Sequence, residues 1–192
     1  AERVEHDAVL RRDLAGLAAE RRQDPFDTLF DVMAAQGDGL ADAVVIAWVY
    51  DEQDIVAVMR NPARMIGSGG YTLGQSGPLG AWRFHPRSYG TFPRVLARYV
   101  REQRVLSLEE AVRKMTSVPA ARFKLGRRGL LARAYVADVV AFDPHAVVDL
   151  ADYEHPNTLA SGIRHVVVGG TPVIENGAHL GARPGRALRR AD

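Results

Sequence analysis

Glycines concentrate in one stretch of this sequence and offer the first candidate for chemistry. Gly67-Ser68-Gly69-Gly70 is followed closely by Gly74 and Gly77. Glycine-rich turns expose backbone N–H groups and can cradle phosphate. However, no Gly-Lys-Ser/Thr is present, and the dinucleotide fingerprint would need glycine at the position of Thr72. The stretch therefore does not predict a phosphate site.

The side chains that could bind metal or act as nucleophiles show no useful spacing. The six histidines include no His-x-His and no His-x-x-x-His pair, and the sequence has no cysteine. A serine elbow of the form Gly-x-Ser-x-Gly is absent as well. We therefore expect no metal ligand and no catalytic triad from these residues. His165 is expected to be a half-buried strand residue.

The composition is that of a globular protein, with 47% hydrophobic and 25% charged residues. No apolar run approaches the roughly 18 residues that span a bilayer, so we expect no membrane partner. The N-terminus shows no secretory pattern, and the cytoplasm is the expected location. The net charge is only +2, and no basic stripe alternates with aromatic residues. Nucleic-acid binding is therefore not favoured.

Local signals place helices and strands alternately before the glycine-rich stretch. Asp13 is expected to cap one helix, and Asp24-Pro25 to open another with Phe26, Leu29, Phe30 and Met33 on one face. The apolar run 43–49 predicts a buried strand, Asp51 starts a helix, and residues 64–68 predict a second strand. Together these segments predict a βαβ unit, as in parallel sheets or barrels.

The second half of the sequence begins with a long loop, and its predicted elements then change from helices to strands. Residues 69–90 form a predicted loop with six glycines and two prolines. Helices are expected around Phe92–Tyr99 and from Ser107 to Met115. From residue 129 strands dominate: one at 137–144, and a hairpin at 163–175 that turns at Gly169-Gly170. An isolated hairpin is marginally stable, so these strands need partners.

Several of these stretches together resemble the N-acyl-D-amino-acid deacylase (D-aminoacylase) family of the amidohydrolase superfamily. The similar segments, in chain order, are Met65–Gly70, His85–Arg94, Leu108–Thr116, Arg128–Leu131, Ala137–Val140 and Gly181–Arg186. They cover nearly the whole chain.

The resemblance implies an α/β fold, namely the C-terminal portion of a metal-dependent (β/α)8 barrel plus part of a small β-sandwich domain. Residues 1–128 would then supply the last strands and helices of the barrel, and residues 129–192 the C-terminal strands of the sandwich. The family hydrolyses N-acyl-D-amino acids with barrel-bound zinc. A metal-generated hydroxide attacks the acyl carbonyl while an aspartate transfers the proton.

Two departures from the family pattern bear on activity. Gly69 stands where the family motif Gly-Ser-Asp-Gly has its aspartate, and glycine cannot carry a proton. The family's metal ligands lie in an N-terminal part of the barrel that this sequence does not contain. No catalytic or metal-binding residue is therefore expected here, and zinc is not expected to bind this chain alone.

One functional residue matches the family pattern. Arg87, in His85-Pro86-Arg87, corresponds to the arginine that holds the substrate carboxylate, and a planar guanidinium suits that task. The alternative is an arginine that only staples the loop. His85 and Tyr89 flank Arg87 and could line a pocket, without an assigned role.

We therefore expect a fragment of an N-acyl-D-amino-acid deacylase that is inactive as an isolated chain. The alternative is a non-catalytic subunit or pseudoenzyme, which would bind a carboxylate ligand or a separate N-terminal half.

Overall fold

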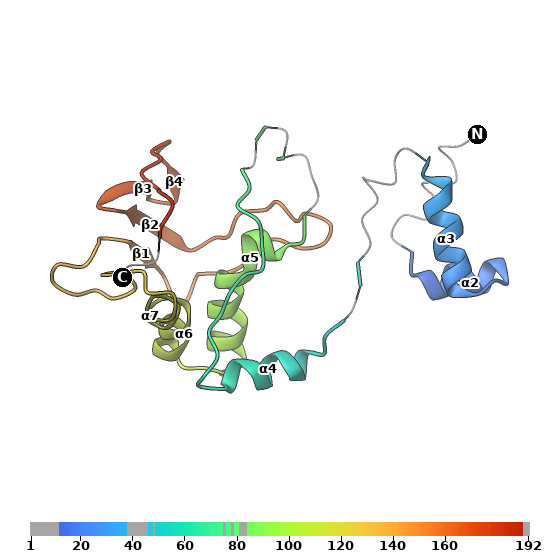
Figure 1. Cartoon of the computed structure of the whole chain (residues 1–192), viewed down its shortest axis with the longest axis horizontal. Helices are drawn as coiled ribbons and strands as arrows, with labels where there is room; N and C mark the ends of the chain where they lie inside the picture. Colours follow the sequence, from blue (N-terminus) through green and yellow to red (C-terminus); the bar gives the residue numbers. More distant parts are fainter. Residues whose placement is uncertain are drawn as a thin grey trace. The chain divides into compact units, whose positions relative to one another are not determined.

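The computed structural model describes residues 12–37, 46–47, 49–74, 76–77, 79–80 and 84–189. The chain divides into two compact units, Ala1–Trp48 and Val49–Asp192. Helices and one antiparallel sheet make this a mixed α/β chain (Figure 1). None of the helices in the described ranges is long and apolar enough to cross a membrane.

The described residues of the first unit include the helices α2 and α3, whose starts were predicted correctly. Helix α2, Leu14–Arg21, is capped by Asp13, whose carboxylate accepts the Gly16 N–H at 2.7 Å. Helix α3, Pro25–Ala35, is capped by Asp24, which accepts the Phe26 N–H at 2.8 Å. Each cap satisfies a backbone donor that the first helical turn leaves without a partner.

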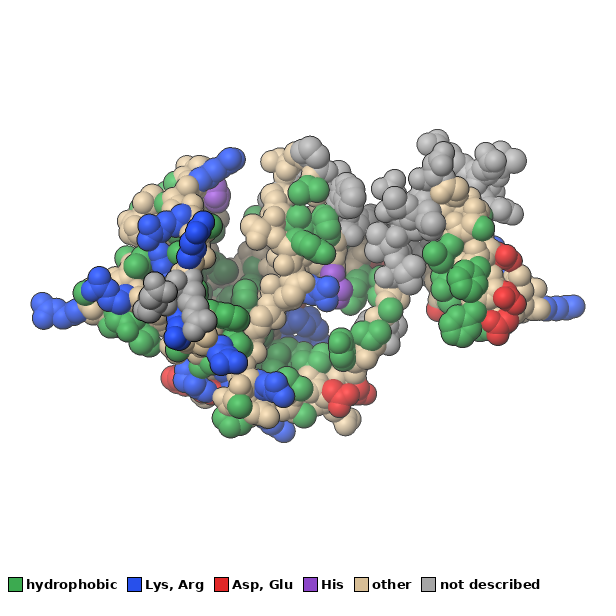
Figure 2. Space-filling view, viewed as in Figure 1, with side chains coloured by type: hydrophobic (Ala, Val, Ile, Leu, Met, Phe, Trp, Pro, Cys, Tyr) green, Lys and Arg blue, Asp and Glu red, His purple; other side chains and the backbone are tan. Residues whose placement is uncertain are grey.

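The apolar face of α3 is exposed within this unit. Phe26 and Phe30 are 69% and 62% exposed, whereas Thr28 on another face is fully buried. Apolar side chains are accordingly visible on the surface of the α2–α3 unit (Figure 2). A second short helix can cover only one side of α3, so the remaining apolar side chains stay in contact with solvent.

The predicted strands before the glycine-rich stretch are not observed in the described residues. Most of the run 43–49 lies outside them, and its described members, Ile46, Ala47 and Val49, are not in a strand. The predicted strand at 64–68 is wrong, because this segment pairs with no strand. The Ile66 N–H instead donates to the carbonyl of Lys114 at 3.1 Å. A strand needs a neighbouring strand, and this segment has a helix end beside it.

Helices make up the first half of the second unit. Helix α4, Glu52–Arg60, begins at the predicted cap Asp51, and α6, Leu108–Met115, begins at the predicted cap Ser107. A short helix, α7, follows at Ser117–Arg122. Both predicted caps accept a backbone N–H within three residues, at 2.7 Å for Asp51 and 3.2 Å for Ser107.

The predicted loop 69–90 ends earlier than expected. Helix α5 already begins at Arg87 and runs to Arg94, where the π-helix η2, Val95–Glu102, continues it. Pro93 lies inside α5 and has no N–H to donate. Pro93 interrupts the series of backbone hydrogen bonds in the α-helix, which is consistent with the change to π-type hydrogen bonding in the following turns.

The core of the second unit lies between α4, η2 and α6. Its buried members are Val95, Tyr99, Leu106 and Ala111. Side chains of α4 pack against this cluster, and the helix lies across one end of η2 (Figure 1). Arg98 on η2 also forms an ion pair with Glu52 on α4 at 3.0 Å.

The C-terminal strands form a sheet of their own. The strands β1 (Val139–Phe142), β2 (Ile163–Val168), β3 (Thr171–Glu175) and β4 (Ala178–His179) pair antiparallel in sequence order. The predicted hairpin turn is confirmed, since Gly169 and Gly170 have φ values of 57° and 84°. The hairpin thus finds its partner strands within the chain, and His165 is half-buried in β2 as expected.

A buried lysine joins α6 to the chain that leads into the glycine-rich stretch. Lys114 is 1% exposed, and its ammonium donates to the carbonyls of Asn61 and Arg64 at 2.6 and 2.9 Å. Glu110 lies 3.7 Å away and offsets part of the charge. A buried ammonium is stable only when such partners replace its water.

We expect Lys114→Met to lower the free energy of unfolding by about 2 kcal/mol or more, because carbonyls lose a charged donor that water does not fully replace. Urea unfolding followed by circular dichroism measures the change. Lys124→Met is the matched control, since Lys124 is exposed and should respond by less than about 0.5 kcal/mol. Equal effects of the two substitutions would contradict the structural role of Lys114.

Candidate functional site

The glycine-rich stretch lies beside the first turn of α5. Gly69 has a φ of +58°, and a Cβ added there would lie 3.9 Å from the Nε of Arg87, with no other neighbour within 4 Å among the described residues. The structure therefore brings together the two residues that the sequence singled out. A side chain at position 69 would point into the space beside the Arg87 guanidinium.

Gly70 allows the glycine-rich stretch to lie close to the first turn of α5. A Cβ at this position would lie 2.7 Å from the Ser88 Cα and 3.2 Å from the Arg87 carbonyl oxygen. Two hydroxyl groups bind the same segment: Ser68 accepts the Gly70 N–H at 3.1 Å, and Ser88 accepts the Tyr71 N–H at 3.3 Å. The backbone at Gly70 lies directly against the backbone of Arg87 and Ser88, so only glycine fits at position 70. Local sequence propensity does not reveal this requirement.

Arg87 presents its guanidinium without using it for the fold. The side chain is exposed and makes no hydrogen bond or ion pair with any residue that the structure describes. Only its backbone is engaged, with the N–H donating to His85 and the carbonyl accepting from Thr91. Among the described residues, the guanidinium N–H donors are therefore available to an anion. Whether Arg87 holds a substrate or staples the loop stays a prediction.

His85 has two partners, one of which the sequence did not indicate. Its Nδ1 accepts the Arg87 N–H at 3.0 Å, and its Nε2 lies 3.1 Å from the hydroxyl of Tyr153. The rings of His85 and Tyr153 meet edge to face with centroids 5.3 Å apart. Burial, followed by the positive charge of Arg87, lowers the pKa of His85 from 6.5. The imidazole is therefore neutral near pH 7.

Tyr89 is half-buried and points its hydroxyl away from solvent. That oxygen is buried and has no hydrogen-bond partner within the described ranges. The expectation that Tyr89 could line a pocket rests on its place beside Arg87 in the sequence, and it stays a prediction.

The residues that the structure describes do not fit a zinc site. Zinc sites in proteins use three or four histidine, cysteine or carboxylate ligands. No group of three such side chains that could hold a metal ion occurs among the residues described. Gly69 contributes no side-chain ligand either.

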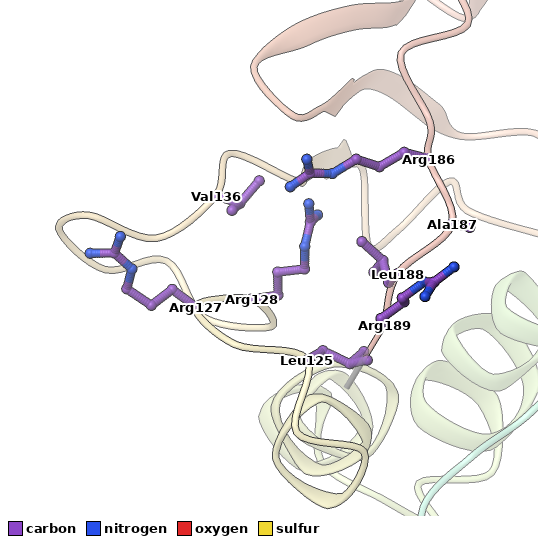
Figure 3. A pocket seen from close by; sticks show the side chains of 8 residues that line it. All are labelled: Leu125, Arg127, Arg128, Val136, Arg186, Ala187, Leu188 and Arg189. Atoms are coloured by element: carbon purple, nitrogen blue, oxygen red, sulfur yellow. The ribbon is translucent and has the colours of Figure 1, made fainter. Parts of the chain in front are cut away.

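A separate cleft of about 340 Å³ lies where the C-terminal tail passes the loop after α7. Arginines from both segments line it, and Arg128 and Arg186 point toward each other across it (Figure 3). Arg128 pairs with Asp138, whose other oxygen accepts the Gly169 N–H at 2.8 Å. Arg127 and Arg186 are exposed, so water solvates their charges. The cleft shares no residue with the Gly69–Arg87 site.

The chain is a mixed α/β chain in which an exposed arginine lies beside a glycine-rich segment. A sequence model described as "Amidohydrolase family" matches residues 3–174. The chain therefore belongs to the amidohydrolase family.

Within that family, the chain is similar to deacylases of N-acyl-D-amino acids. The chain is 41% identical over 179 residues to a D-aminoacylase of Alcaligenes xylosoxydans xylosoxydans, covering 93% of this chain and 34% of that protein. A solved D-aminoacylase with a binuclear metal centre superimposes with a TM-score of 0.75 at 38% identity, over 93% of this chain and 35% of that one. An N-acyl-D-glutamate deacylase from Bordetella bronchiseptica, solved with zinc and a phosphonate inhibitor, gives a TM-score of 0.69 at 38% identity, over 92% and 34%. The chain thus spans about a third of the length of the relatives it matches.

We expect Gly70→Ala to destabilise the contact between the glycine-rich stretch and α5, because the new Cβ meets backbone atoms of Ser88 at 2.7 and 3.1 Å. Hydrogen–deuterium exchange of segments covering residues 66–90 should rise. Gly67→Ala is the matched control, since a Cβ there meets nothing within 4 Å. Unchanged exchange in Gly70→Ala would show that this close approach does not form.

We expect the stability of the chain to fall as the pH drops below about 6.5, in part through His85. Its pKa is lower in the folded chain than in the unfolded one, so protons bind the unfolded chain preferentially in that window. Urea unfolding at about pH 7.5 and about pH 5.5 should show a larger loss for the wild type than for His85→Asn, which cannot titrate. Equal losses would contradict the lowered pKa.

Proposed function

We propose that this chain supplies the C-terminal part of an N-acyl-D-amino-acid deacylase, an enzyme that hydrolyses the C–N amide bond of N-acyl-D-amino acids. The observation that carries the proposal is the approach of Arg87 to position 69 in a chain 41% identical to a D-aminoacylase. Arg87 and position 69 both lie in segments that carry the family resemblance, and the sequence identity covers the same segments.

Arg87 would hold the substrate carboxylate. An N-acyl-D-amino acid ends in a carboxylate, and a planar guanidinium can bind it through two parallel hydrogen bonds. The free guanidinium of Arg87 is compatible with this role, since it has no other partner in the described part of the chain. The same grip would orient the acyl amide toward position 69, whose Cβ would be 3.9 Å from Arg87 Nε.

The domain division is also a proposal. Residues 1–128 would belong to the barrel and residues 129–192 to the sandwich. The change from helices, which end with α7 at Arg122, to strands, which begin with β1 at Val139, supports a boundary in this region. Exposed apolar side chains in both parts, such as Phe30 and Leu131, offer surfaces that further barrel and sandwich elements would cover.

Turnover would need groups from outside this chain. Gly69 provides no proton carrier, and the described residues provide no cluster of metal ligands. We infer that zinc, where it serves the full-length enzyme, is held by residues of an N-terminal half. The contribution of this chain would be to bind and orient the substrate.

We expect the purified chain, supplied with zinc, to release no free D-amino acid from N-acetyl-D-amino acids above the uncatalysed rate. The physical reason is the absence of a metal-activated nucleophile and of an ionisable group at position 69. A D-aminoacylase assayed in parallel is the control. Zinc-dependent turnover that co-purifies with this chain would contradict the prediction.

A chimeric enzyme tests the proposed function directly. The matching third of the Alcaligenes D-aminoacylase is replaced by this chain, with Gly69 or with Gly69→Asp. We expect the Gly69→Asp chimera to hydrolyse N-acyl-D-amino acids at least roughly 10²-fold faster than the Gly69 chimera, because only aspartate can carry the proton.

Gly69→Asn is the matched control for that comparison. Asparagine has nearly the shape of aspartate and tolerates a positive φ, but it does not titrate. Its chimera should remain as slow as the Gly69 chimera. If the Gly69→Asp chimera folds, as judged by circular dichroism, and is equally inactive, the proposed function fails.

A further inference from the structure

The loop between β1 and β2 contacts α5 and the segment before it. Asp149 in this loop forms an ion pair with Arg94 of α5 at 3.1 Å, and a Cβ on Gly90 would lie 3.0 Å from the Asp149 Cβ. Asn157, farther along the loop, donates to the carbonyl of Gly80 at 2.7 Å. The loop therefore lies directly against α5 and the segment before it (Figure 1).

Tyr153 lies between these two anchors and contacts His85. Its hydroxyl is 3.1 Å from His85 Nε2, and the two rings pack edge to face with an interplanar angle of 77°. The Nδ1 of His85 accepts the Arg87 N–H, so the neutral ring carries its proton on Nε2. That proton points toward the Tyr153 hydroxyl oxygen, which accepts it.

We propose that Tyr153 and His85 are positioning residues for Arg87: Tyr153 fixes the His85 ring, and the ring fixes the Arg87 backbone at the first turn of α5. The inference rests on the proposed function, in which Arg87 holds a substrate carboxylate. It adds two residues that act through Arg87, one of them contributed by the sheet-forming half of the chain.

Without the contact to His85, the backbone of Arg87 would have more conformational freedom. Its guanidinium is held by no side chain in the described ranges, so its position depends on where the backbone begins the helix. Pro86, which precedes it, provides no side-chain cap for α5. The imidazole Nδ1 takes that place by accepting the Arg87 N–H at 3.0 Å. A fixed backbone leaves fewer positions open to the Arg87 side chain, so less entropy is lost when the guanidinium binds a carboxylate.

Histidine-selective NMR of the 192-residue chain tests the inference. The six histidines give few signals, and His85→Asn assigns the one of interest. N-acetyl-D-alanine is titrated into wild type, Tyr153→Phe, Arg87→Ala and the control Tyr50→Phe. Tyr50 is 79% exposed, so that control removes a hydroxyl that packs against little.

The NMR signal of His85 reports both its contact with Tyr153 and the binding of N-acetyl-D-alanine at Arg87. Its ¹⁵N shifts should show the Nε2–H form in wild type. Arg87 helps to lower the pKa of His85, so a carboxylate bound to Arg87 should raise that pKa and shift the titration midpoint upward. A merely structural role for Tyr153 would not change this ligand-dependent shift.

We expect Tyr153→Phe to bind N-acetyl-D-alanine roughly two- to five-fold more weakly than wild type, as for one lost hydrogen bond, while Tyr50→Phe binds like wild type. Arg87→Ala should show no ligand-dependent shift. The other histidine signals, unchanged in Tyr153→Phe, establish that the variant is folded.

Two results would overturn the inference, and they are distinguishable. Equal affinity of Tyr153→Phe and wild type would remove the positioning role but leave Arg87 as the carboxylate site. No ligand-dependent shift of His85 in wild type would remove the role of Arg87, and the positioning inference would fall with it.

Discussion

The buried ammonium of Lys114 is the interaction on which the geometry around Arg87 depends. Its two strong hydrogen bonds end on carbonyls of the turn after α4, and its own carbonyl accepts the Ile66 N–H. A charge at 1% exposure is stable only if these partners stay in place, so α6 and the turn are fixed to each other. The chain then enters Gly67–Gly70 from a defined point, which brings position 69 within 3.9 Å of Arg87 Nε.

The other side of the site is fixed by the loop between β1 and β2. Arg101 donates to the carbonyls of Pro144 and Val147 at 3.2 and 2.7 Å, and Val147 is fully buried. Gly162 closes tightly on the Val147 N–H, where a Cβ would lie only 2.4 Å away. Together with the Arg94–Asp149 pair, these contacts hold the sheet-forming half against the helices. The loop between β1 and β2 is thus fixed against the helix that begins at Arg87.

The chain belongs to the amidohydrolase family, and the residue beside its exposed Arg87 is a glycine. The backbone at Gly69 adopts a φ of +58°, which aspartate tolerates better than most residues, and the space for its side chain is open. An aspartate would therefore fit at this position without a clash with the described neighbours. In the proposed function, carboxylate binding by Arg87 would be separable from proton transfer at position 69, because the two steps would depend on different side chains.

Local chemistry alone determined the starts of α2, α3, α4 and α6 and the turn of the hairpin. Caps at Asp13, Asp24, Asp51 and Ser107, and the turn at Gly169-Gly170, act within a few residues and were predicted correctly. The family motifs also singled out Gly69 and Arg87 before their proximity was visible. Tertiary structure decided the rest. The segment 64–68 lies beside Lys114 rather than in a strand, and the Tyr153 hydroxyl meets His85 across 68 positions of sequence. Such contacts depend on how distant segments pack, and periodicity and capping within a short window carry no information about them.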